Sequence, residues 1–227
     1  MDSWRKIWDN KNRVNNFLFE TLIKADGFET GAGNFTLEDW KLYTVSLLKY
    51  LDIAKNDTIF DVGCGSGAFL FNHFINNHKV GGVDYSEALI ELAKIIFKGS
   101  DFSVDEASKL DTKNKYDFVV SHSVFQYFND LSYSKTVLLK MLEKANKKVG
   151  IFDINDKSKE KSYHKIRMES MDENQYLNKY QGLDHMFYEK SWFKKIAEEN
   201  DLKIKIFDQS FIGYSNSKLR FNVIIEK

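Results

Sequence analysis

The chain has 227 residues, and its 33 Lys and Arg balance its 33 Asp and Glu, so no basic excess points to nucleic acid as a partner. An apolar content of 43% excludes a disordered protein, and no run approaches the about 18 apolar residues of a membrane span. With one cysteine and a charged N-terminus, we expect a cytoplasmic protein with no disulfide, no metal ion and no membrane partner.

The first 57 residues have helical character and several aromatic side chains. Within them, the segment Asp26–Trp40 is rich in glycine but follows a helical stretch, so it is not a nucleotide loop. Thr36, with Asp39 three residues later, predicts a helix start. We interpret residues 1–57 as a helical lid segment and residues 58–227 as the core of the protein.

From residue 58 onward, apolar β-rich runs alternate with helical periodicity, which predicts βαβ units in an α/β fold. The last two strands have no room for a helix between them, so we expect seven strands, mostly parallel, with an antiparallel last strand and helices on both faces. A charged, aromatic insert at about 155–190 is the expected acceptor side. The expected strands are Thr58–Val62, Val80–Val83, Phe102–Val104, Phe118–Ser121, Val149–Asp153, Lys203–Phe207 and Phe221–Ile225, and the expected helices are Ala68–Asn76, Glu87–Phe97, Ser134–Ala145 and Ser191–Glu199.

The first strand ends in a loop with the spacing Gly63-x-Gly65-x-Gly67. This spacing differs from the G-x-G-x-x-G of a nicotinamide site, and the Lys-Ser/Thr of a phosphate-binding P-loop is absent. Glycines still allow a ligand close to the backbone, because they have no Cβ and tolerate positive φ. Asp61 lies in the apolar run before this loop, where a lone carboxylate is costly, so it predicts a ligand that carries an ammonium group.

Polar residues also follow the next three strands. Asp84 ends the second strand, Asp105-Glu106-Ala107 follows the third, and Ser121-His122 follows the fourth. Ligands of open α/β sheets bind at the carboxyl ends of the strands, where an acid accepts hydrogen bonds from ribose hydroxyls. Asp84 could instead cap the helix that starts at Glu87, together with Ser86.

The motifs Asp61–Gly67, Asp84–Ser86, Asp105–Ala107 and Tyr116–Ser121 resemble those of the class I S-adenosylmethionine-dependent methyltransferases. This resemblance implies a Rossmann-like fold with S-adenosylmethionine as cofactor. It implies that Asp61 and the glycine loop hold the methionine moiety, Asp84 the ribose and Tyr85 the adenine face, with Glu106, Ala107 and Asp105 at the adenine edge. The cofactor residues it implies are Asp61, Gly63, Cys64, Gly65, Gly67, Asp84, Tyr85, Ser86, Asp105, Glu106, Ala107 and Ser121.

Features that the sequence lacks exclude some classes of methyl acceptor. The amino-methyltransferases of DNA carry a proline-containing motif after the fourth strand, and this chain has no proline; Cys64 is misplaced for cytosine methylation. No DNA is therefore expected, and a small molecule is favoured. An oxygen acceptor needs a base, for which we consider His122, His185 and Tyr188 as catalytic candidates, although His122 could equally be a hydrogen-bonded loop residue.

The segment Asp26–Trp40 resembles the lid loops of small-molecule methyltransferases from bacterial sugar and surface-polysaccharide pathways. The resemblance implies a sugar-linked or phosphorylated acceptor, such as a capsule precursor or its phosphoramidate group. Methylation of a small amine or amino sugar is the alternative, and RNA methylation or a non-catalytic cofactor-binding module are weaker ones. The sequence leaves the oligomeric state open.

Overall fold

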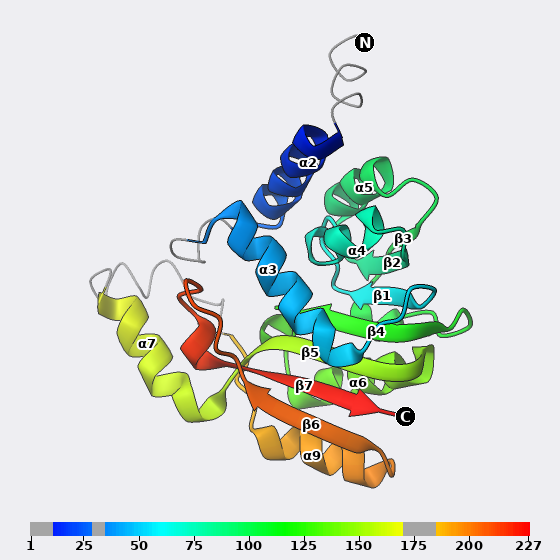
Figure 1. Cartoon of the computed structure of the whole chain (residues 1–227). Coiled ribbons are helices and arrows are strands. Elements are labelled where there is room, and N and C mark those ends of the chain that lie inside the picture. The colour runs from blue at the N-terminus through cyan, green and yellow to red at the C-terminus, as the bar shows by residue number, and fades with distance from the viewer. Residues whose placement is uncertain (1–10, 29–34, 170–184) are drawn as a thin grey trace.

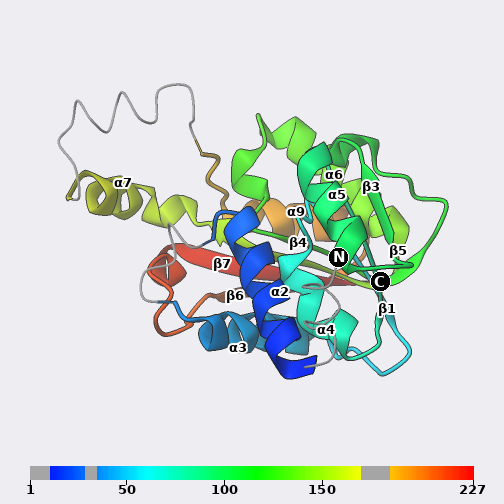
Figure 2. The same ribbon diagram turned by 90° about the horizontal axis from the view of Figure 1, so that it is seen from above.

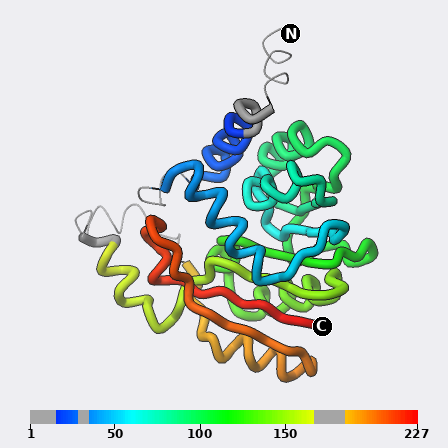
Figure 3. Tube along the Cα trace, in the orientation of Figure 1, coloured from blue at the N-terminus to red at the C-terminus, as the bar shows by residue number. Residues whose placement is uncertain are grey.

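The structure is a computed structural model that describes residues 11–28, 35–169 and 185–227 (Figure 1), and Figure 3 traces the same path as a tube. The glycine-rich part of the expected lid loop, at 29–34, and residues 170–184 of the expected insert lie outside this range. In the described residues no helix has both the length and the apolar character needed to cross a membrane.

Seven strands form one sheet in the order β3-β2-β1-β4-β5-β7-β6. Strand β7 is antiparallel to β5 and β6, and the other neighbouring pairs are parallel, which confirms the expected fold class. The strand order reverses between β1 and β4, because β2 and β3 follow β1 on one side while β4 and β5 lie on the other. At such a point a crevice opens at the carboxyl ends of the parallel strands. The strands are β1 Thr58–Val62, β2 Lys79–Asp84, β3 Asp101–Val104, β4 Tyr116–His122, β5 Ala145–Asn155, β6 Lys203–Asp208 and β7 Arg220–Glu226.

The helices cover both faces of the sheet, as Figure 2 shows for α3 and α4 on one side and α6 and α9 on the other. Two hydrophobic clusters follow the same division, one beneath α2 to α5 and one beneath α6 and α9. The helices are α2 Lys11–Ala25, α3 Leu37–Leu48, α4 Phe71–Ile75, α5 Glu87–Ile96, α6 Leu131–Lys144, α7 Glu160–Glu169 and α9 Lys190–Glu199.

Side-chain caps mark the starts of α3 and α6. Thr36 and Asp39 form a reciprocal capping box on α3, as predicted. Helix α6 begins earlier than expected because the Asp130 carboxylate accepts a hydrogen bond from the Tyr133 N–H at 2.7 Å. Helix α7, inside the insert, was not predicted.

Helix α3, from the expected lid segment, packs in the same cluster as the sheet. Its residues Trp40, Tyr43 and Leu47 are buried there. The described part of residues 1–57 therefore contributes core as well as cavity wall. The division of the chain at residue 57 stays a prediction.

Candidate functional site

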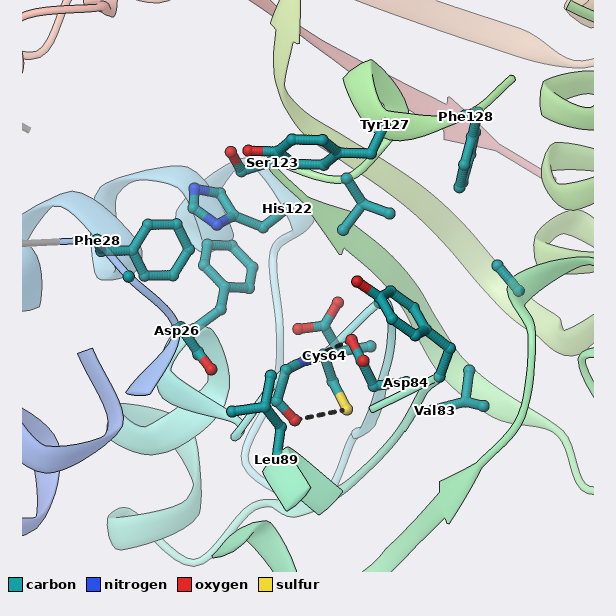
Figure 4. A pocket seen from close by; sticks show the side chains of 18 of the residues that line it. Asp26, Phe28, Cys64, Val83, Asp84, Leu89, His122, Ser123, Tyr127 and Phe128 are labelled. Carbon is teal, nitrogen blue, oxygen red and sulfur yellow. Dashed lines mark hydrogen bonds between the residues drawn. The ribbon is translucent and has the colours of Figure 1, made fainter. Parts of the chain in front are cut away.

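A cavity of about 680 Å³ opens at the carboxyl edge of the parallel strands. Figure 4 shows Asp84 and Cys64 on one side of it and His122, Ser123 and Tyr127 on another. The strands β1, β2, β3 and β4 end at this edge, and each of them sends the residues that follow it into the wall. The expected site residues that line the cavity are Asp61, Gly63, Cys64, Gly65, Asp84, Tyr85, Asp105, Glu106, Ala107, His122 and His185.

The glycine loop leaves no room for side chains at its first two glycines. Gly63 and Gly65 have φ of +76° and +53°. A Cβ on Gly63 would lie 2.5 Å from the Val124 side chain, and one on Gly65 would lie 2.5 Å from Oδ1 of Asp26. Both residues line the cavity, so the backbone of the loop forms part of the cavity wall without side chains.

The Asp84 carboxylate ties the glycine loop to the start of α5. It accepts hydrogen bonds from the Gly65 N–H and from the Ser86 N–H, both at 2.9 Å. Ser86 is the residue before the helix, but its side chain makes no capping hydrogen bond. The two interpretations of Asp84 are thus compatible, since it holds local structure while it lines the cavity; its contact with a ribose stays a prediction.

Asp61 is 1% exposed, and its Oδ1 is buried without a hydrogen-bond partner among the described residues. Burial, together with the charges of Asp26 and Asp84, raises the pKa of its carboxyl well above the usual range. A buried oxygen without a donor is costly. The site therefore favours a ligand that brings a cation or an N–H donor to Asp61.

Asp26 is a third acid at this site, and the sequence did not single it out. It follows α2, and its Oδ1 accepts a hydrogen bond from the Ser66 N–H in the glycine loop at 2.7 Å. Burial raises its pKa to about 7, against the effect of the hydrogen bonds with Ser66. The N-terminal segment thus contributes a carboxylate to the cavity wall, together with Phe28 and Trp40.

We expect Asp26→Asn to stabilise the ligand-free protein in neutral and alkaline solution. The folded-state pKa lies above the unfolded value of 3.8, so the wild type loses this contribution to stability as the pH rises from about 4 through about 7. The variant avoids that loss and keeps an oxygen acceptor for Ser66, for a gain of at most about 4 kcal/mol at pH 8.

Urea unfolding of both proteins at pH 5 and pH 8 measures this gain. Asp39→Asn is the control with the opposite sign, because hydrogen bonds with Thr36 lower the pKa of Asp39. A gain for Asp26→Asn that is equal at both pH values would contradict the assignment.

His122 ends β4 and is 5% exposed. Its ring stacks on Phe69 with a centroid distance of 4.4 Å, and Nε2 lies 3.1 Å from the Tyr43 hydroxyl. Nδ1 is buried without a hydrogen-bond partner among the described residues. Burial lowers the pKa of His122 to about 4, so the imidazole is neutral near pH 7 and has a lone pair to accept a proton.

The structure brings His185 to the same cavity. Its Nδ1 lies 2.6 Å from the Tyr163 hydroxyl of α7, and its ring contacts that of Tyr127 edge-on at 5.1 Å.

Tyr85 is 82% exposed while it lines the cavity. An aromatic face so exposed is available to a planar ligand, as its predicted role at the adenine requires.

Tyr188 is a correction to the sequence-based prediction. Its side chain is fully buried among Phe125 and Phe193 in the cluster beneath α6 and α9, and it does not line the cavity. Its hydroxyl donates a hydrogen bond to the Phe125 carbonyl at 2.8 Å and lies 2.7 Å from the Ser134 hydroxyl. With both its surface and its hydroxyl occupied, Tyr188 is a core residue.

Gly67, Ser86 and Ser121 do not line the cavity either. Gly67 has φ of +92° and packs against the Phe97 ring, and the Ser121 hydroxyl donates to the Val62 carbonyl. These residues shape the loop and the strand ends from behind. Cys64 does line the cavity, and burial raises the pKa of its thiol well above the usual range, so it is no nucleophile.

Residues 53–209 match the model of a family described as a methyltransferase domain. Malonyl-(acyl-carrier protein) O-methyltransferase 1 of Ilyobacter polytropus is 27% identical over 164 residues, which cover 68% of this chain and 59% of that protein. A malonyl-(acyl-carrier protein) O-methyltransferase of Acetivibrio thermocellus is 30% identical over 105 residues, 43% of this chain and 37% of its own. The chain spans about a third to three fifths of the length of the curated relatives it matches.

Solved structures share the fold. Magnesium protoporphyrin IX methyltransferase from Synechocystis with bound SAH superposes with a TM-score of 0.59 at 18% identity, over 96% of this chain and 98% of that one. An N-methyltransferase from Bradyrhizobium japonicum gives 0.59 at 13% identity, over 84% and 97%. The family match, with such relatives, confirms the predicted methyltransferase domain and its cofactor, S-adenosylmethionine. The similar proteins include both O-methyltransferases and an N-methyltransferase, so similarity to them does not identify the acceptor atom.

Proposed function

Because this chain belongs to the methyltransferase domain family, we propose that it transfers a methyl group from S-adenosylmethionine to an oxygen atom of a small, polar acceptor. The class we favour is a sugar-linked or phosphorylated metabolite, such as a capsule precursor or its phosphoramidate group. One observation carries the proposal. The same cavity is lined by the buried carboxylate of Asp61 and by the neutral imidazole of His122, and each has an atom without a hydrogen-bond partner among the described residues.

The residues present fit the cofactor. The orphaned oxygen of Asp61 suits the ammonium of the methionine moiety, and the bare backbone at Gly63 and Gly65 permits close approach. Asp84 and the exposed ring of Tyr85 suit ribose and adenine, with Asp105 and Glu106 further along the wall. When bound, S-adenosylmethionine supplies a methyl group on a positively charged sulfur, which the nearby acids also favour.

His122 is the residue we assign to the acceptor proton. A hydroxyl group becomes a better nucleophile as its proton moves to a base, and His122 is neutral with one ring nitrogen unpartnered. Tyr43 and Phe69 fix the plane of its ring, so the lone pair has a defined direction. An amine acceptor that is already neutral would not need this group.

Calorimetry with S-adenosylhomocysteine, followed by a transfer assay, tests the proposal. We expect one S-adenosylhomocysteine to bind per chain, and a panel of hydroxyl-bearing sugar phosphates and phosphoramidates to accept label from methyl-labelled S-adenosylmethionine. Absence of binding at millimolar ligand would refute the cofactor site. Transfer to amines alone would refute the oxygen acceptor and support the amine alternative.

A further inference from the structure

Charge is unevenly distributed along the wall of the cavity. All of its acidic residues come from β1, the ends of β2 and β3, and the turn after α2. Among the described lining residues, Arg220 is the only lysine or arginine, and it lies with His122 and Tyr214 in the remaining part. The acids suit the cationic cofactor, so Arg220 is left for a different ligand.

The topology places Arg220 at this edge. Strand β7 runs antiparallel to β5, so its first residue, Arg220, lies beside Asn155 at the carboxyl end of β5. The side chain is 4% exposed, with its guanidinium carbon 5.9 Å from the centre of the Tyr163 ring. A buried arginine at the start of the one antiparallel strand is therefore held at the cavity wall by the sheet itself.

A chain of contacts links Arg220 to the candidate base. Asp153 accepts a hydrogen bond at 2.9 Å from Gln209, whose Oε1 accepts one from the Tyr43 hydroxyl at 3.2 Å, and that hydroxyl lies 3.1 Å from His122. Asp153 is also 3.7 Å from Nε of Arg220. Arg220 and His122 thus belong to one end of the cavity.

The hydrogen-bonding capacity of Arg220 is largely unused. Nη1 donates to the Asn155 side chain, whereas Nε is buried with no hydrogen-bond partner among the described residues. The 3.7 Å from Nε to Asp153 is an ion pair but too long for a hydrogen bond. A guanidinium has five N–H donors, and a buried donor without an acceptor is costly.

Asp153 does not depend on Arg220 for its own hydrogen bonds. Gln209 and the Tyr214 hydroxyl each donate to it at 2.9 Å. Burial opposes its ionisation most strongly, but the charge of Arg220 together with the neighbouring His122 and the hydrogen bonds with Ser123 and Tyr214 keeps the pKa of Asp153 below its usual value. The pair is therefore ionic, and the acid is saturated while the arginine still has donors to offer.

We propose that Arg220 anchors the methyl acceptor by an oxyanion, a carboxylate or a phosphate, and that the acceptor is therefore an anion. Arginine suits either group, because its planar fork matches two oxygens at once. The inference rests on the proposed function, since it assigns a class of substrate to the same cavity. It also agrees with the lining of this end of the cavity, because Asp153, the acid beside Arg220, does not line the cavity and is already paired with Arg220.

The test measures anion binding to the protein saturated with S-adenosylhomocysteine, and again without it, by calorimetry with inorganic phosphate and with malonate. We expect at least one of the two anions to bind one per chain. Arg220→Lys should weaken that binding about tenfold or more, because the charge remains but the fork is lost. Lys218→Gln, an exposed neighbour, is the control and should leave it unchanged.

Arg220→Gln alone would leave Asp153 as a buried, unpaired charge, so the second variant is Arg220→Gln with Asp153→Asn. It should abolish anion binding while S-adenosylhomocysteine affinity stays within about threefold, which shows a folded cofactor site. Preference for phosphate or for malonate tells which oxyanion is recognised.

Two results would overturn the inference. One is the absence of binding by either anion at about 50 mM, and the other is equal anion affinity in both Arg220 variants. Failure of the proposed function looks different, because the wild type would then not bind S-adenosylhomocysteine whether or not an anion binds.

Discussion

Asp61→Asn is expected to weaken S-adenosylhomocysteine binding by about 30-fold to several thousand-fold, since loss of one partner of a buried charge pair costs about 2–5 kcal/mol. The same substitution should make the ligand-free protein more stable above neutral pH. Burial raises the pKa of Asp61 well above its usual range, so the wild type loses stability as its carboxyl ionises, and asparagine does not.

Calorimetry and thermal unfolding of the same preparations measure both effects. The opposite signs are what identify a ligand-binding acid, because a residue that only supports the fold would lose affinity and stability together. Asp111→Asn, exposed and outside the cavity, is the control for the change of charge. Unchanged S-adenosylhomocysteine affinity in Asp61→Asn would show that the methionine moiety binds elsewhere.

His122→Gln is expected to lower kcat with a hydroxyl acceptor by about 100-fold or more, because it removes the base but keeps a polar side chain. Affinity for S-adenosylhomocysteine should change little. His73→Gln is a matched control, since burial also lowers the pKa of His73 to about 4 but this residue does not line the cavity. A kcat that falls less than a few-fold in His122→Gln would instead favour an amine acceptor.

The pH profile gives an independent reading of His122. Its pKa of about 4 lies below the ordinary 6.5, so the residue stays neutral and active as the pH falls from 7.5 to 5.5. An ordinary histidine would lose about tenfold in rate over that interval. The measurement needs saturating cofactor, because Asp26 lines the same cavity and ionises near pH 7.

Much of the fold could be predicted because its signals are local. Each of the seven predicted strands overlaps a strand of the structure. The glycine spacing and the acids after successive strands also predicted residues that line one cavity, since parallel strands end at one edge. Helix α7 escaped because its sequence is charged and has little apolar periodicity.

The errors and omissions concern contacts between distant segments. Tyr188 and His185 are three residues apart, and both are polar aromatic side chains near the end of the insert, yet only His185 lines the cavity. Tyr188 forms an isolated β-bridge with Asp156, and the Tyr188 side chain packs in the cluster beneath α6 and α9. Nothing in the local sequence states which face a side chain takes when the segment's register on the sheet is unknown.

The sequence by itself determined the fold class, the glycine loop and the identity of Asp61 and Asp84 as acids at strand ends, because periodicity and spacing are encoded along the chain. Only the tertiary structure decided that Asp26 joins those acids and that Arg220 stands at the other end with His122. Asp26 reaches the loop from the N-terminal segment, and Arg220 arrives on a strand that runs backwards. The role of each charged side chain depends on its burial and on its neighbours, and both exist only once the sheet has formed.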